Sequence, residues 1–277
     1  MLPRPIALVV LAALCLASAL RAGEEKEVSY LEGDALATAD AYRLKQCRLD
    51  LRLPSDHSGF ATIVWFHGGG LTGGSRHFPE IDDRSIGLVA VSYRLSPAAA
   101  HPAYLEDAAA AVAWTLRHIR EHGGDPKKVF VAGHSAGGYL AAMIGMDPRW
   151  LAAHGLSHHD LAGIIPVSAQ VTTHFLVKKL RGDTAPELRP IIDEFAPLYY
   201  AAKDLPPICL IVGDRRIEYK NRVEENVLLA TSLRNLGHPM VEFYEMGGLD
   251  HGGVVRGSYL LMAGFVQRVL AQPPAAR

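Results

Sequence analysis

The sequence predicts an α/β protein with a mainly parallel, doubly wound sheet and helices on both faces of it. Short apolar runs of strand length, such as residues 62–66 and 129–132, alternate with helical stretches such as residues 108–119 and 223–236. That alternation is typical of repeated strand–helix–strand units. The chain has 277 residues, of which 49% are hydrophobic and 21% charged, enough for one sizeable core. We therefore expect a single domain over residues 23–277.

The first of these strands, residues 62–66, runs into a glycine-rich loop that reads HGGG over residues 67–70. Successive glycines let backbone N–H groups turn toward a substrate oxygen, because no side chain stands in the way. A loop of this pattern completes the oxyanion hole of lipases and esterases. We expect Gly69 and Gly70 to donate such hydrogen bonds, and His67 to hold the loop in shape.

A G-x-S-x-G motif joins the strand at residues 129–132 to a predicted helix over residues 136–143. It reads GHSAG over residues 133–137 and fits a nucleophile elbow, a tight turn that pushes a serine hydroxyl into a cleft. Such a strained turn crowds its neighbours, so the positions two before and two after the serine must be small. The motif predicts acyl transfer through Ser135, with the backbone N–H of Ala136 as a third oxyanion donor.

The order HGGG and then GHSAGG resembles the α/β-hydrolase superfamily, in particular its esterase and lipase branch of hormone-sensitive-lipase-like and feruloyl-esterase-like carboxylesterases. The resemblance runs from about Tyr42 to the C-terminus and includes the VSYRLSP stretch at residues 91–97. His134 departs from the hormone-sensitive-lipase-like pattern, which usually has Asp there, and points toward the other branch. The resemblance implies a triad in the order serine, acid, histidine.

Three later strands are predicted, over residues 161–169, 208–212 and 243–246. The acid is expected after the second of these strands and the base after the third. A loop that reads GGLDHGG follows the last strand and places His251 between glycines, as the family places its catalytic base. Among 13 histidines, this one alone has that context.

Two carboxylates, Asp214 and Glu218, follow the strand at residues 208–212. The family commonly has its aspartate three residues after the glycine at position 213, where this chain has Arg216. In related enzymes the acid lies about nineteen residues before the glycine that closes the next helix, which here is Gly237. This spacing favours Glu218 over Asp214 as the residue that orients His251.

These parts predict a serine carboxylesterase that forms an acyl-enzyme and needs no metal or other cofactor. We expect small-molecule or polysaccharide-borne esters of short-chain or aromatic acids. Residues 171–200 are expected to form part of a cap, with Phe175, Leu176 and Tyr199 as pocket walls, or else a surface excursion. The alternatives are an amidase of the kynurenine-formamidase type and a non-catalytic binding module. A net charge of −1 gives no electrostatic footprint for nucleic acid, and the sequence leaves the oligomeric state open.

The first 22 residues have the layout of a secretory signal peptide, with Arg4 before an apolar run over residues 6–20. We expect cleavage near residue 22 and a secreted or periplasmic protein. The apolar run is short for a stable membrane span of about 20 residues. Beyond it only Cys47 and Cys209 remain, and a disulfide between them is left open.

Overall fold

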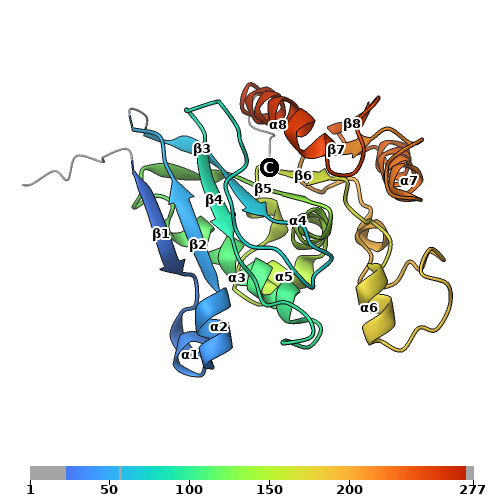
Figure 1. Cartoon of the computed structure of the whole chain (residues 1–277). Coiled ribbons are helices and arrows are strands. Elements are labelled where there is room, and N and C mark those ends of the chain that lie inside the picture. Colours follow the sequence, from blue (N-terminus) through green and yellow to red (C-terminus); the bar gives the residue numbers. More distant parts are fainter. Residues whose placement is uncertain (1–22, 56–57, 273–277) are drawn as a thin grey trace, which may run out of the picture.

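The computed structural model describes residues 23–55 and 58–272, and its strands form one twisted sheet (Figure 1). Across the sheet the strand order is β1-β2-β4-β3-β5-β6-β7-β8. The strands are β1 (Glu24–Ser29), β2 (Arg48–Arg52), β3 (Phe60–Phe66), β4 (Gly87–Val91), β5 (Gly124–His134), β6 (Gly163–Val167), β7 (Ile208–Gly213) and β8 (Val241–Met246). β2 pairs antiparallel with β1 and β4, whereas the other pairs are parallel. The predicted mainly parallel sheet is confirmed.

Helices cover both faces of this sheet, as predicted. Their bounds are α1 (Gly33–Ala37), α2 (Ala41–Gln46), α3 (Ala103–His118), α4 (Ala136–Met146), α5 (Pro148–Ala152), α6 (Phe175–Leu180), α7 (Arg222–Asn235) and α8 (Val254–Leu270), with 3₁₀ turns η1 (His158–Asp160) and η2 (Pro197–Tyr200). Side chains of α3, α4 and α7 share one hydrophobic core, and α8 packs into a second one on the opposite face.

The strand β3 shows how the sequence builds these two cores. Each of its seven residues is buried, which is the pattern of a strand covered on both faces. Because side chains alternate along a strand, Val64 and Phe66 face the core of α3 and α4, while Ile63 and Trp65 face the core of α8. The long apolar run is therefore read correctly as a central strand.

Three further expectations concern the cap segment, the N-terminus and the two cysteines. Residues 171–200 hold α6 and η2, and Figure 1 shows α6 and the loop after it, in yellow, projecting to one side of the sheet. The predicted signal peptide, residues 1–22, lies outside the described residues. Cys47 and Cys209 are both buried and free, so the disulfide left open by the sequence does not form. Among the helices of the described ranges, none has the length and apolar character to cross a bilayer.

Candidate active site

The predicted elbow lies between β5 and α4. Ser135 has φ 55° and ψ −116°, a backbone conformation that side chains other than glycine rarely adopt. A Cβ atom at Gly137 would lie 2.0 Å from the carbonyl oxygen of Phe66, and one at Gly133 would lie 2.4 Å from the backbone of Gly137. Both flanking positions therefore require glycine, for the steric reason that the sequence motif suggests.

His251 connects the serine to a carboxylate. Its Nε2 atom lies 2.9 Å from Ser135 Oγ, and its Nδ1 atom lies 2.6 Å from Oε1 of Glu218. In the tautomer that satisfies both contacts, Nδ1–H donates to the carboxylate and Nε2 accepts from the serine hydroxyl. The structure thus places three predicted site residues, which come from loops after β5, β7 and β8, in one chain of hydrogen bonds.

The Glu218 carboxylate is held on both oxygens. Oε1 also accepts from the backbone N–H of Tyr219 at 2.7 Å, and Oε2 accepts from the Ser168 hydroxyl and from the Gly213 N–H at 2.9 Å. Burial alone raises the pKa of Glu218, but the hydrogen bonds from His251, Ser168 and Tyr219 outweigh it and lower the pKa to about 2. The group is therefore an anion at neutral pH, which favours a fixed imidazole.

Asp214, the other carboxylate in question, serves a turn instead. It pairs with the Arg216 guanidinium and accepts from the backbone N–H of Gly248 at 2.8 Å. The hydrogen bond from Arg216 holds the pKa of Asp214 well below its usual range. No hydrogen bond joins Asp214 to His251 within the described ranges, so of the two carboxylates only Glu218 reaches the imidazole.

The HGGG loop passes directly beside the elbow. A Cβ atom at Gly68 would lie 3.5 Å from Cβ of Ser135, and the next two glycines have φ of 113° at Gly69 and 64° at Gly70. Ala136 is the first residue of α4, where a backbone N–H has no acceptor inside the helix. In the part of the chain that the structure describes, no acceptor pairs with the N–H groups of Gly69, Gly70 or Ala136. These three predicted donors are free to bind a substrate oxygen.

His67 packs under this loop. Its ring stacks on Tyr93 at 4.4 Å between centroids, and the Tyr93 hydroxyl donates to the His67 carbonyl oxygen at 2.7 Å. Burial lowers the pKa of His67 to about 4, so the ring is neutral near pH 7. These contacts fit the expected role of holding the loop in shape.

His134 has a contact that the sequence does not reveal. Its Nε2 atom lies 2.7 Å from the carbonyl oxygen of His251, and the two imidazole rings are 4.7 Å apart. Burial lowers the pKa of His134 to about 4, and the neutral ring can donate from Nε2–H to that carbonyl. His134, directly before Ser135, therefore holds the backbone of His251, whose imidazole contacts Ser135.

A pocket of about 490 Å³ opens beside His251, a volume within the usual range for small-molecule sites. Its lining is Glu187, Leu188, Ile217, Glu218, Tyr219, Lys220, Asp250 and His251. The Tyr219 ring lies 5.8 Å from the His251 ring and, nearly parallel, 6.5 Å from the Phe175 ring. Phe175 in turn approaches Gly70, since a Cβ there would lie 3.8 Å from it. Two aromatic rings thus flank the site, one near the oxyanion loop and one near the imidazole.

Of the three pocket walls expected from residues 171–200, Phe175 alone lies at this site. Leu176 is half-buried against the main core, and Tyr199 is 60% exposed and packs edge-on against Tyr200. Tyr219 was missed, although its place directly after Glu218 was a usable signal. No group of three or more His, Cys, Asp or Glu side chains could hold a metal ion within residues 23–55 and 58–272.

A family model described as the alpha/beta hydrolase fold matches residues 63–254. Carboxylesterase NlhH of Mycobacterium tuberculosis is 37% identical over 102 residues, or 35% of this chain and 32% of NlhH. Esterase LipC of the same species is 25% identical over 206 residues, or 68% of this chain and 50% of LipC. The matches therefore span between about a third and a half of these relatives.

Solved structures share the fold over nearly the whole chain. A truncated carbohydrate esterase from gut microbiota superposes with a TM-score of 0.71 at 17% identity, over 92% of this chain and 99% of that one. Esterase 2 of Thermogutta terrifontis, phosphoramylated by tabun, gives a TM-score of 0.69 at 23% identity, over 91% of this chain and 97% of that one. At these identities the likeness concerns the fold.

Proposed function

The chain belongs to the alpha/beta hydrolase fold family, and on that premise we propose that it is a serine carboxylesterase. The observation that carries the proposal is the hydrogen-bonded series from Ser135 through His251 to Glu218, set beside three unpaired backbone N–H groups. A nucleophile, a base with an orienting anion, and donors for a developing oxyanion are the parts that acyl transfer requires.

The proposed reaction begins with attack of Ser135 Oγ on the ester carbonyl carbon. His251 Nε2 takes the hydroxyl proton as the C–O bond forms, and Glu218 stabilises the resulting imidazolium. The carbonyl oxygen becomes an oxyanion that accepts from the Gly69, Gly70 and Ala136 N–H groups. When the intermediate collapses, His251 gives the proton to the leaving alcohol and an acyl-serine remains. Water then attacks the acyl-serine carbonyl carbon while His251 takes its proton. His251 returns this proton to Ser135 Oγ as the carboxylic acid leaves.

Short-chain or aromatic acyl groups suit the pocket beside His251. The Tyr219 ring lines this pocket, and its apolar face can contact a short or planar acyl group. The names of the relatives NlhH and LipC, a carboxylesterase and an esterase, support ester substrates. The carbohydrate esterase of the same fold is in keeping with polysaccharide-borne esters as one source of substrate. Residues 171–200 would cap this pocket through Glu187 and Leu188, which line it.

The test is a series of p-nitrophenyl esters from acetate to octanoate, together with p-nitrophenyl benzoate. The wild type should hydrolyse the short-chain and benzoyl esters, and Ser135→Ala should lose this activity by at least about a thousandfold. Hydrolysis of formylkynurenine in preference to each of these esters would favour an amidase. An absence of turnover with every ester would leave a binding module.

We also propose that the protein is exported, on the layout of residues 1–22. Expression of the full chain in a bacterial host, followed by N-terminal sequencing of the periplasmic protein, should give a start near residue 23. Recovery of the intact N-terminus from the cytoplasm would contradict export.

A further inference from the structure

Arg222, the first residue of α7, has a buried guanidinium nitrogen, Nη1, with no hydrogen-bond partner in the described part of the chain. The residue is 4% exposed, and its Nη1 atom is fully buried with no hydrogen-bond acceptor. No hydrogen bond or ion pair to the Arg222 side chain is present anywhere in the described ranges. A guanidinium carries five N–H donors, and burial of unpaired donors is costly. An oxygen atom from outside the protein, of a water or of a ligand, can satisfy this nitrogen.

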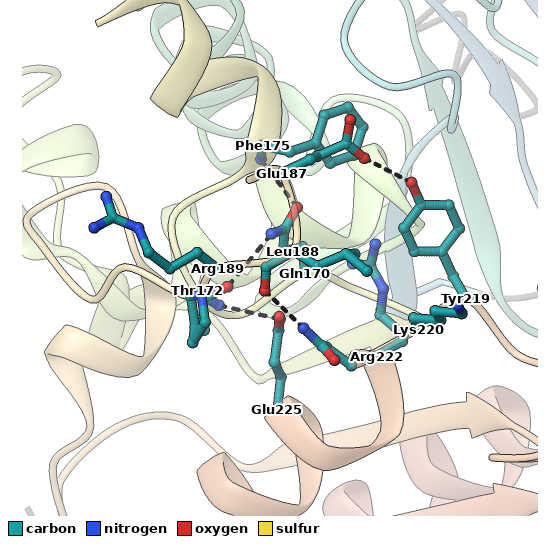
Figure 2. A pocket seen from close by; sticks show the side chains of 12 residues that line it. Gln170, Thr172, Phe175, Glu187, Leu188, Arg189, Tyr219, Lys220, Arg222 and Glu225 are labelled. Carbon is teal, nitrogen blue, oxygen red and sulfur yellow. Dashed lines mark hydrogen bonds between the residues drawn. The ribbon is translucent and has the colours of Figure 1, made fainter. Parts of the chain in front are cut away.

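A narrow niche next to Arg222 offers the place for that group (Figure 2). It is lined by Gln170, Thr172, Phe175, Glu187, Leu188, Arg189, Pro190, Tyr219, Lys220, Asn221, Arg222 and Glu225. Its free volume is about 10 Å³, close to that of one water-sized atom. A single oxygen atom of a ligand therefore fits there, and the rest of that ligand must lie elsewhere.

Burial lowers the pKa of Arg222 and the nearby charges of Glu225 and Glu218 partly offset this, but within the described residues no charged group forms an ion pair or hydrogen bond with its guanidinium. Glu225 accepts from the backbone N–H groups of Val171 and Thr172, and it forms no ion pair with Arg222 within 4.0 Å. Glu187 accepts from the Tyr219 hydroxyl at 2.9 Å. Figure 2 shows the guanidinium of Arg189 pointing away from the other lining residues.

The niche adjoins the pocket beside His251, because both are lined by Glu187, Leu188, Tyr219 and Lys220. The Tyr219 ring lies 5.6 Å from the Arg222 guanidinium carbon and 5.8 Å from the His251 ring. The guanidinium carbon and the centre of the imidazole ring are therefore no more than about 11.4 Å apart. An acyl chain attacked by Ser135 can extend from one to the other.

We propose that Arg222 binds a carboxylate at the far end of the substrate's acyl group, so that monoesters of dicarboxylic acids are preferred substrates. One carboxylate oxygen enters the niche, and the acyl chain lies in the adjoining pocket. Arginine is suited to this task because a guanidinium N–H forms a strong, charge-assisted hydrogen bond to a carboxylate oxygen and because its charge persists when buried. This proposal rests on the proposed esterase function.

The test compares the p-nitrophenyl monoesters of succinate, glutarate and adipate with the neutral p-nitrophenyl butyrate. The wild type should give a higher kcat/KM for one of the monoesters than for butyrate. Arg222→Gln should lower this monoester-to-butyrate ratio by about 10- to 100-fold, the usual effect of losing a hydrogen bond to a charged group. Arg222→Lys should lower it less. The matched control is Arg256→Gln, which removes an 81% exposed guanidinium on α8 that is paired with Glu80, away from the niche and the pocket, and should leave the ratio unchanged.

Several outcomes would overturn the proposal. One is a wild-type ratio that favours butyrate at every chain length, a result that needs no variant and so holds even if Arg222→Gln fails to fold. Another is an equal loss of both activities in Arg222→Lys. Competitive inhibition by acetate as strong as that by glutarate would show a site for free anions instead.

Failure of the esterase function is measured separately. If butyrate and the monoesters are all inert, thermal unfolding of Ser135→Ala is followed with monomethyl glutarate and with methyl butyrate. Stabilisation by the first compound alone, lost in the double variant with Arg222→Gln, supports the carboxylate site without catalysis. Equal responses to the two compounds contradict it.

Discussion

The Nε2 atom of His134 lies 2.7 Å from the carbonyl oxygen of His251, although the two residues are 117 positions apart in the chain. This hydrogen bond joins the elbow that carries Ser135 to the loop that carries the imidazole. Because His134 directly precedes Ser135, the hydrogen bond holds the backbone of His251 close to the backbone of Ser135. His134 therefore helps to set the position of the His251 imidazole relative to Ser135.

Replacement of His134 by Phe should lower kcat without a matching rise in KM. Phe keeps a ring beside His251 but removes the Nε2–H donor, so the loop loses one hydrogen bond worth about 1 kcal/mol, or roughly five- to tenfold in rate. Steady-state kinetics with p-nitrophenyl butyrate measure the effect. The exposed His159, changed to Phe, is the control and should keep full activity. A rise in KM with kcat unchanged would mean that His134 acts on substrate binding.

The two carboxylates after β7 should respond differently to conversion to their amides. Glu218→Gln removes the anion that orients His251, and kcat should fall by about 10³- to 10⁴-fold. Asp214→Asn weakens a turn through Arg216 and Gly248, and it should lower the urea midpoint with less than a tenfold loss of activity. Urea unfolding and ester hydrolysis separate the two effects. A larger loss of kcat in Asp214→Asn than in Glu218→Gln would contradict the assignment of the acid.

The elbow should reject any side chain at Gly137. An added Cβ would lie 2.0 Å from the carbonyl oxygen of Phe66, and a backbone atom cannot move aside as a flexible side chain can. We expect Gly137→Ala to lower the free energy of unfolding by about 3 kcal/mol or more and to abolish activity. Gly247→Ala is the control, because nothing lies within 4 Å of a Cβ atom there. Equal stability of the two variants would mean that the turn relaxes.

Much of the sheet was predictable because its central strands are buried on both faces. Short, continuous apolar runs such as those of β3, β5, β6 and β7 are typical of buried central strands. The edge strand β1 differs, because it reads EEKEVS and lies mostly exposed. No apolar pattern marks it as a strand, so its pairing with β2 could not be predicted from hydrophobicity. The final helix, α8, was not predicted, although its buried residues recur at helical spacing along the sequence.

The site was predictable where a motif fixes local backbone, and not where a contact is made at long range. The steric demand on Gly133 and Gly137 is written into five neighbouring residues. By contrast, Arg222 opens a helix, a position where a charged side chain is ordinarily solvated, and its burial arises from loops more than thirty residues away. The hydrogen bond of His134 to His251 likewise depends on how two distant loops meet.

His174 should make the stability of the protein fall with acid in a defined pH range. Its Nδ1 atom accepts from the backbone N–H of Leu176 at 3.2 Å and so caps α6, which requires the unprotonated ring. Burial, and then the nearby charge of Arg222, lower the pKa of His174 from 6.5 to about 3. Because the unfolded chain binds the proton more readily, this contribution is complete above pH 6.5 and is lost as the pH falls toward 3.

Asn in place of His174 keeps a capping oxygen but does not titrate, so it provides the comparison for this range. Between pH 7 and pH 5 the wild type should lose about 2 kcal/mol more of its unfolding free energy than His174→Asn does. Urea midpoints at the two pH values measure this difference, and the other buried histidines contribute equally to both proteins. Parallel losses in the two proteins would mean that His174 is protonated without cost, and that the cap of α6 does not depend on the neutral ring.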